Sequence, residues 1–309
     1  MKKIAFLFPG QGAQYVGMGK DFYEQSQLCK DVYKQAEEVT GIPVAELCFE
    51  ENDRLNITEF TQIAILTTEI AMLRALEEKG IHASVTAGLS LGEYGAIVAS
   101  GVLTQEDAFR LIRKRGIYMQ EAVPTGGAMS AVLGMETSAI EKICEQTDGV
   151  VGIANYNCPG QIVITGEEAA VAKASEKLQE AGAKRCIALK VSGPFHSPLL
   201  ETAGVKLAEE LEGIEIHDIE IPYISNVTAD YVTDKKQIKS LLEKQVSSSV
   251  KWQQSIEKMI HDGVSVFIEI GPGKTLTGFM KKIDSSVQVM NIEKYEDLEK
   301  VVTLLTEAE

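Results

Sequence analysis

Ser90 has the sequence context of a nucleophile, because Gly88, Leu89, Ser90, Leu91 and Gly92 form a G-x-S-x-G pattern. An apolar run, residues 85–87, precedes the pattern, and helix-forming residues 93–99 follow it. This order predicts a strand, a sharp turn with the serine at its tip, and a helix. The glycines permit the turn because they carry no Cβ. Free N–H groups at the start of the helix could stabilise an oxyanion. We therefore favour a nucleophile over an ordinary surface turn.

A serine nucleophile needs a base, and the chain offers only four histidines: His82, His196, His217 and His261. Three of them lie before a strand or among charged residues, and we interpret them as surface side chains. His196 lies between Pro194 and Pro198, at the end of an inserted segment. Because clefts form at domain junctions, His196 is the best candidate for the base, and a loop histidine without a role is the alternative.

The order of Ser90 and His196 differs from the serine, acid, late histidine order of α/β-hydrolase triads. Strands are still predicted after His196, and no carboxylate stands out as its partner. We therefore expect a backbone carbonyl to orient the imidazole, which would give a serine–histidine dyad.

Arg115 is the most informative charge in the sequence. On a helical wheel of residues 105–122 it falls near the middle of an apolar face, whereas Arg110, Arg113 and Lys114 fall outside that face. One interpretation is an arginine that extends to the edge of the face and reaches water. The other is an inward guanidinium, which must meet an anion. Arginine pairs with a carboxylate through two parallel hydrogen bonds, so this interpretation predicts a carboxylated substrate.

Composition narrows the possible partners and compartments. The chain has 309 residues, 45% of them hydrophobic, and a formal net charge of −15, which argues against nucleic acid or an anionic membrane as the main partner. Five cysteines without a C-x-x-C pair or zinc spacing fit a reducing, cytoplasmic setting without a metal. The apolar start, residues 4–8, is too short for a signal peptide and predicts a first strand. No run is long enough to span a membrane.

Apolar runs alternate with helical patterns along most of the chain. Strands are predicted at residues 4–8, 84–89, 221–225, 264–270 and 287–292, and helices at, for example, residues 63–79, 105–122, 201–211 and 255–261. This alternation predicts a mainly parallel sheet covered on both faces.

The middle of the chain has a different order. Strands are predicted at residues 128–133, 150–157, 161–166 and 184–189, and helices at 138–146 and 168–181. The order βαββαβ predicts a ferredoxin-like unit. We therefore predict a discontinuous domain, residues 1–125 and 196–309, with residues 126–195 inserted as a small domain.

With these residues assembled, the chain resembles the malonyl-CoA:acyl carrier protein transacylases from end to end. The matching motifs are Phe8–Gly12, Thr61-Gln62, Gly88–Tyr94, Arg115-Gly116 before Met119–Ala122, Asn155–Asn157 before Pro159–Gln161, Pro194–His196 and Glu269–Lys274. The resemblance implies an α/β-hydrolase-like domain with a ferredoxin-like insert.

The resemblance also implies roles for individual residues. Ser90 would be acylated, His196 would act as the base, and Arg115 would hold the malonyl carboxylate. The backbone N–H groups of Gln11 and Leu91 would form the oxyanion hole. Gln62 and Asn157 would lie in the cleft, and a carbonyl in the segment around Lys251 would orient the histidine.

The implied activity is a two-step, ping-pong transfer of malonyl from malonyl-CoA to the phosphopantetheine thiol of acyl carrier protein, supplying fatty acid synthesis. No metal or redox cofactor is needed, and we expect a cytoplasmic monomer that neither binds nucleic acid nor inserts into membranes. A trans-acting malonyl loader of a polyketide synthase would share these motifs. A serine thioesterase or esterase would need no inward Arg115 and would usually have an acid partner, and a binding module would need neither Ser90 nor His196.

Docking of the carrier protein poses an electrostatic problem, since acyl carrier proteins are acidic and so is this chain. Two like-charged proteins need a local positive patch to associate productively. The predicted candidates are two clusters, the first formed by Lys184, Arg185 and Lys190, and the second by Lys274, Lys281 and Lys282.

Overall fold

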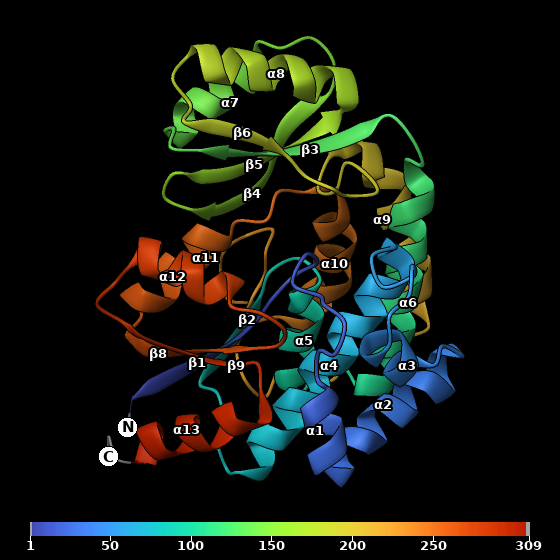
Figure 1. The fold of residues 1–309 in the computed structure, drawn as a ribbon. Coiled ribbons are helices and arrows are strands. Elements are labelled where there is room, and N and C mark those ends of the chain that lie inside the picture. The colour runs from blue at the N-terminus through green and yellow to red at the C-terminus, as the bar shows by residue number, and fades with distance from the viewer. Residues whose placement is uncertain (1, 307–309) are drawn as a thin grey trace.

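The computed structural model describes residues 2–306 and contains two separate sheets (Figure 1). The larger sheet is parallel, with strand order β7-β2-β1-β8-β9. Its strands are β1 (Lys3–Phe8), β2 (Val85–Gly88), β7 (Tyr223–Ile224), β8 (Val264–Ile270) and β9 (Gln288–Ile292). The smaller sheet is antiparallel, with strands β3 (Gly127–Leu133), β4 (Val151–Cys158), β5 (Gln161–Glu167) and β6 (Arg185–Ala188). The mixed α/β architecture is as predicted.

Helices surround the parallel sheet and cover one face of the antiparallel one (Figure 1). They are α1 (Lys20–Gln25), α2 (Gln27–Thr40), α3 (Val44–Phe49), α4 (Thr58–Glu78), α5 (Gly92–Ala99), α6 (Gln105–Ala122), α7 (Thr137–Glu145), α8 (Glu168–Glu180), α9 (Glu201–Glu212), α10 (Ile238–Ser247), α11 (Trp252–His261), α12 (Thr275–Ile283) and α13 (Tyr295–Thr306). Short 3₁₀ turns occur at Pro198–Leu200 and Lys235–Gln237. Within residues 2–306, no helix is both long and apolar enough to cross a bilayer.

The parallel sheet is buried on both faces, which explains the uninterrupted apolar run of β1. Successive side chains of a strand point to opposite faces. Ala5 and Leu7 pack in a core with Trp252 of α11 and neighbouring residues of α12. Phe6 and Phe8 pack in the other core, which is built largely from α4, α5 and α6. The sheet is therefore the middle layer of a three-layer unit.

The antiparallel sheet has one face for its own core and one face for the rest of the molecule. Val132, Ile162 and Ile164 pack with side chains of α7 and α8, which lie on the outer face in Figure 1. The alternate residues Ala131 and Val163 belong to the core of the larger unit. The two faces follow from the period of two along β3 and β5.

A short segment before α11 joins the two sheets. Val250 N–H donates to Ala154 O at 2.8 Å, and Tyr156 N–H donates to Val250 O at 2.9 Å. The Ser249 hydroxyl also donates to Ile153 O at 2.6 Å. This segment therefore runs beside β4 like an additional strand and fixes the antiparallel sheet over the larger unit.

Most predicted elements match the structure within a few residues, and two differences stand out. Helix α4 begins at Thr58 rather than at residue 63, because polar residues of its first turns are buried by tertiary contacts. The prediction for residue 63 onward rested on apolar periodicity, which Thr61 and Gln62 interrupt. Helices α1, α2 and α3 were also not among the predicted examples.

Candidate active site

Ser90 lies at the tip of a sharp turn between β2 and α5. Its backbone is left-handed, with φ of 56°, which is unusual for a residue with a Cβ. A Cβ on Gly88 would lie 1.9 Å from the carbonyl carbon of Gly92, and a Cβ on Gly92 would lie 2.1 Å from Phe8 O. The glycines of the pattern are therefore required by close backbone approach.

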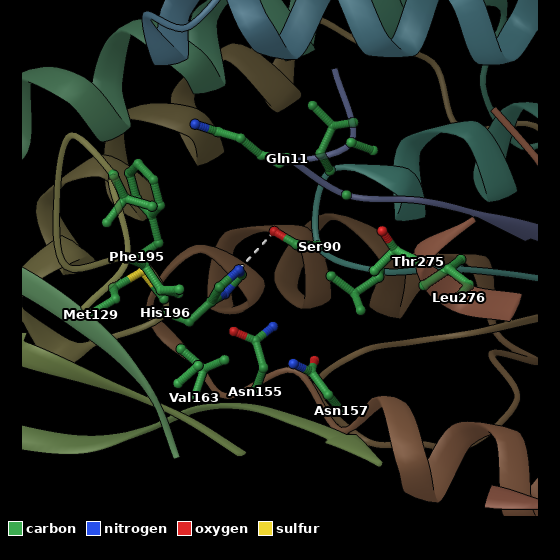
Figure 2. A pocket seen from close by; sticks show the side chains of 18 of the residues that line it. Gln11, Ser90, Met129, Asn155, Asn157, Val163, Phe195, His196, Thr275 and Leu276 are labelled. Carbon is green, nitrogen blue, oxygen red and sulfur yellow. Dashed lines mark hydrogen bonds between the residues drawn. The ribbon is translucent and has the colours of Figure 1, made fainter. Parts of the chain in front are cut away.

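His196 lies beside Ser90 in the cavity between the two sheets, and the two side chains point toward each other (Figure 2). The Ser90 Oγ and His196 Nε2 atoms are 2.7 Å apart. His196 Nδ1 lies 3.0 Å from Gln245 O and 3.1 Å from Ser248 O. Because a carbonyl oxygen can only accept, Nδ1 carries the proton and Nε2 presents its lone pair to the serine. The orienting carbonyls belong to residues 245 and 248, and not to Lys251 itself.

The surroundings of His196 favour the neutral imidazole. The side chain is 4% exposed. Burial, followed by the positive charge of Arg115, lowers the pKa of His196 to about 4, although the two carbonyls oppose the shift. An unprotonated Nε2 next to a hydroxyl is the arrangement that a general base requires.

Arg115 points inward, as the helical wheel predicted, and is 1% exposed. Its NH1 donates to Gln62 Oε1 at 2.7 Å, and its NH2 donates to Gln245 Oε1 at 3.0 Å and to Ser90 Oγ at 3.3 Å. The guanidinium also lies 5.6 Å from the Tyr94 ring centroid. No carboxylate forms an ion pair with Arg115 in the described part of the chain. The group is a buried cation whose partners are neutral.

All of the predicted site residues line one cavity of about 250 Å³ between the sheets: Gln11, Gln62, Ser90, Leu91, Arg115, Asn157 and His196. The antiparallel sheet supplies an apolar wall that includes Met129 and Val163, and Phe195 lies beside them (Figure 2). Among residues 2–306, no acceptor is found for the backbone N–H groups of Gln11 and Leu91. Two free donors therefore remain near Ser90.

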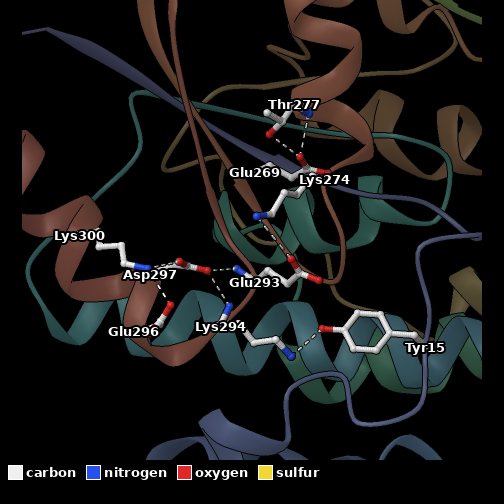
Figure 3. A network of polar contacts seen from close by, with 9 residues as sticks. All are labelled: Tyr15, Glu269, Lys274, Thr277, Glu293, Lys294, Glu296, Asp297 and Lys300. Atoms are coloured by element: carbon white, nitrogen blue, oxygen red, sulfur yellow. Dashed lines mark hydrogen bonds and ion pairs between the residues drawn. The ribbon is translucent and has the colours of Figure 1, made fainter.

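The loop that carries Gln11 is held from two sides. Gln11 Nε2 donates to Thr58 Oγ1 at 3.0 Å. Farther along the same loop, the Tyr15 hydroxyl accepts from Lys294 Nζ at 3.1 Å, and the Lys294 N–H donates to Asp297 Oδ2 at 2.9 Å (Figure 3). These contacts connect the loop after β1 to α4 and to the start of α13.

Gln245 of α10 contacts several parts of the site and was not among the residues predicted from the sequence. Its Nε2 donates to Ser90 O at 2.8 Å and to Glu93 Oε2 at 2.7 Å. Its Oε1 accepts from Arg115 NH2, and its backbone carbonyl accepts from His196 Nδ1. Burial raises the pKa of Glu93 to about 7, and the hydrogen bond from Gln245 opposes the shift. A glutamate in the otherwise apolar α5 was a signal for Glu93. Gln245 gave no signal, since polar residues are ordinary in an amphipathic helix.

The fold and site define the class of protein by comparison with known families. A family model described as the acyl transferase domain matches residues 5–300. The chain is therefore an acyl transferase, with the candidate site inside the matched region.

Individual relatives specify the family within that class. The malonyl CoA-acyl carrier protein transacylase of Bacillus subtilis is 47% identical over 312 residues, covering 99% of this chain and 98% of that protein. A crystal structure of the transacylase of that name from Clostridium perfringens is 47% identical, with a TM-score of 0.96 and coverage of 99% and 98%. A malonyl-transacylase in complex with a type II polyketide acyl-carrier protein is 36% identical, with a TM-score of 0.95 and coverage of 98% and 99%. The chain belongs to the malonyl CoA-acyl carrier protein transacylases.

The environment of His196 predicts an unusual titration. We expect its imidazole to stay neutral down to about pH 5, whereas an exposed histidine titrates near about 6.5. Below about pH 6.5 the imidazole binds a proton in the unfolded chain but stays neutral in the folded chain. This residue therefore lowers the free energy of unfolding as the pH falls from about 6.5 to about 4. NMR of histidine-labelled protein can follow all four histidines, with His196→Ala for assignment. Titration of His196 at about pH 6.5 would contradict the expectation.

Proposed function

We propose that this chain moves malonyl from malonyl-CoA to the phosphopantetheine thiol of an acyl carrier protein through a malonyl-Ser90 intermediate. The observation that carries the proposal is the position of Ser90 Oγ, 2.7 Å from His196 Nε2 and 3.3 Å from Arg115 NH2. A nucleophile, a neutral base and an anion-binding group therefore meet at one point. The names of the relatives support malonyl-CoA and acyl carrier protein as the two substrates.

In the first step, His196 Nε2 takes the hydroxyl proton as Ser90 Oγ attacks the thioester carbonyl. The new oxyanion accepts hydrogen bonds from the N–H groups of Gln11 and Leu91, for which the described part of the chain offers no other acceptor. One such donor contributes about 3 kcal/mol to an acyl-transfer barrier. The carbon–sulfur bond then breaks, and CoA leaves as a thiol with the proton from His196. General base catalysis of this kind contributes about 10²–10⁴-fold.

In the second step, the pantetheine thiol uses the same groups in reverse. The thiol gives its proton to His196 as its sulfur attacks the malonyl ester carbon. The same two N–H groups stabilise the oxyanion, and Ser90 leaves with the proton returned by His196. No metal or redox cofactor enters either step.

Arg115 selects an acyl group that ends in a carboxylate. Its guanidinium is buried and has no ion-pair partner among residues 2–306, so an incoming carboxylate would supply its counter-ion. Burial, and after it the same positive charge, lowers the pKa of His196 and favours the unprotonated base. Gln62 holds one end of the guanidinium, and Asn157 lines the opposite side of the cavity.

The domain organisation belongs to the same proposal. Residues 1–125 and 196–309 would form an α/β-hydrolase-like catalytic domain, and residues 126–195 a ferredoxin-like insert. The element order β3-α7-β4-β5-α8-β6 and the strand order β4-β5-β3-β6 support the second assignment. The parallel sheet, with Ser90 at the carboxyl end of β2, supports the first.

The carrier protein is most simply that of fatty acid synthesis, in the cytoplasm, with the chain acting as a monomer. A carrier protein of polyketide synthesis is a second candidate, because a similar malonyl-transacylase is seen in complex with one. A thioesterase or esterase is disfavoured, since Arg115 is turned inward and carbonyls rather than a carboxylate orient His196.

Formation of the acyl-enzyme is the direct test. Incubation with malonyl-CoA should add one malonyl mass to the intact protein, and the adduct should map to the peptide that contains Ser90. Ser90→Ala should abolish the adduct because the nucleophile is gone. The control is Ser100→Ala, directly after α5. It removes only a hydroxyl that donates to Ile97 O, so the adduct should be kept. An adduct that persists in Ser90→Ala would refute the proposal.

Substitution of Arg115 should change acyl selectivity. Arg115→Ala should raise the free-energy barrier of malonyl transfer by about 2–5 kcal/mol, the cost of losing one partner of a desolvated charge pair. Acetyl transfer should be retained or increased. The control is Arg113→Ala on the same helix, which removes an arginine paired with Glu59 outside the cavity. Steady-state rates with malonyl-CoA and acetyl-CoA provide the measurement. Equal losses with both thioesters would assign Arg115 a structural role.

Of the two predicted docking clusters, we favour the first, around Arg185 and Lys190. Lys274 is paired with Glu293 at 3.9 Å, and Lys282 donates to Gln161 (Figure 3 for Lys274). Arg185 and Lys190 are exposed beside Ile187 and Leu189, which are 44% and 36% exposed, and Leu189 also lines the cavity. This edge of the antiparallel sheet offers positive charge and apolar surface next to the cavity.

Charge reversal at this edge should impair only the carrier-protein step. Arg185→Glu with Lys190→Glu should raise the apparent KM for acyl carrier protein and weaken its salt dependence, because an acidic partner would lose attraction. Transfer to free pantetheine should stay normal. Lys142→Glu on α7, which covers the outer face of the same sheet, is the control. Unchanged carrier-protein kinetics at low salt would place docking elsewhere.

A further inference from the structure

Asn226, in the turn after β7, has a side chain that is 1% exposed and lies against the Ser90 turn. Its Oδ1 accepts from the Ser90 N–H at 2.7 Å, and its Nδ2 donates to Gly88 O at 2.6 Å. Its own backbone is held as well, because its N–H donates to Glu93 Oε2 at 3.3 Å and its carbonyl accepts from Lys251 N–H at 3.0 Å. The backbone of Asn226 is therefore anchored by Glu93 and Lys251, while its carboxamide contacts Gly88 and Ser90 of the turn.

These contacts extend the parallel sheet beyond its last backbone pair. The β2–β7 ladder pairs Thr86 with Tyr223 and Ala87 with Ile224, and it ends there. A carboxamide offers one acceptor and one donor, as a peptide group does. Asn226 thus supplies the next pair of hydrogen bonds to β2 through its side chain. On the other edge of the turn, Leu89 N–H donates to Phe8 O at 3.0 Å.

The Ser90 turn needs this support because its conformation is unfavourable in isolation. Ser90 is left-handed and carries a Cβ, and such a residue persists only where its surroundings hold it in place. Without Asn226, Gly88 O and Ser90 N–H would lose the partners that hold the turn on the β7 side. A small relaxation there would move Ser90 Oγ away from His196 Nε2.

The same contact decides which backbone donor can face the substrate. Ser90 N–H is occupied by Asn226 and cannot serve an oxyanion, whereas the next N–H along the chain, that of Leu91, has no acceptor among the described residues. Asn226 does not line the catalytic cavity, so it does not touch a bound substrate there.

We infer that Asn226 is a positioning residue for acyl transfer, which holds the Ser90 turn so that Oγ faces His196 and the Leu91 N–H faces the developing oxyanion. The inference rests on the proposed acyl-enzyme mechanism. It assigns the contribution of Asn226 to the rate of acylation and not to the binding of malonyl-CoA.

The test measures the rate of malonyl-Ser90 formation under single-turnover conditions, well below the melting temperature of each variant. Asn226→Ala should lower the acylation rate constant by about 10²-fold, the effect of a displacement of about 1 Å in a reacting group. The dissociation constant for malonyl-CoA should change by less than about threefold. Labelling of Ser90 by a fluorophosphonate, which needs no malonyl recognition, should slow in parallel.

Two further variants keep the test decisive. Asn226→Asp keeps the acceptor for Ser90 N–H but places an oxygen against Gly88 O, so it should also be slow; it replaces the alanine variant if that one does not fold. Thr228→Ala is the matched control, because the exposed Thr228 hydroxyl accepts from Asp230 N–H in the same turn without touching Ser90. It should lower stability slightly and leave acylation unchanged.

The possible outcomes distinguish a failure of the proposed function from a failure of the role of Asn226. No malonyl adduct on the unsubstituted protein would overturn the proposed function. A normal adduct on the unsubstituted protein, with acylation in Asn226→Ala or Asn226→Asp within about twofold of it, would overturn only the role of Asn226. A lower melting temperature with unchanged acylation and labelling rates would assign Asn226 a purely structural role and would also overturn the inference.

Discussion

The positively charged side chain of Arg115 is 1% exposed, and its hydrogen-bonding partners among the described residues are all neutral. Removing such a charge from water costs several kcal/mol, which carboxamide oxygens from Gln62 and Gln245 offset in part. The same charge acts on neighbouring titratable groups: it adds to the burial that lowers the pKa of His196, and it opposes the burial that raises the pKa of Glu93. One desolvated guanidinium thus adds to the effect of burial on the protonation of the base and leaves a place for a carboxylate.

The second requirement is geometric, because the serine must stand clear of the sheet on a strained turn. Gly88 and Gly92 have no Cβ that would collide with the nearby backbone. Side chains from α10 and from the turn after β7 form hydrogen bonds that hold the turn in place. Gln245 Nε2 donates to Ser90 O, and the Asn226 carboxamide bonds to Ser90 N–H and Gly88 O, so both side chains contact main-chain atoms of the turn. Their arrangement resembles an extension of the sheet more than a conventional catalytic triad.

The third requirement is enclosure, which neither sheet provides alone. The parallel sheet positions Ser90, and the antiparallel sheet contributes an apolar wall that includes Met129, Ala131 and Val163. The segment around Val250 binds β4 through main-chain hydrogen bonds and also places the Ser248 carbonyl on His196 Nδ1. Attachment of the second sheet and orientation of the base therefore depend on the same few residues.

The sequence by itself determined the features that are local or periodic. The G-x-S-x-G spacing predicted the turn, and apolar runs that alternate with helical patterns predicted the buried parallel sheet. An arginine on the apolar face of residues 105–122 predicted an inward charge. Tertiary structure alone decided which carbonyls orient His196 and placed Gln245 and Asn226 on the Ser90 turn. These residues are 155 and 136 positions from Ser90 in the chain, and their types are ordinary for polar positions. No local pattern records contacts that only the packing of distant helices and strands creates.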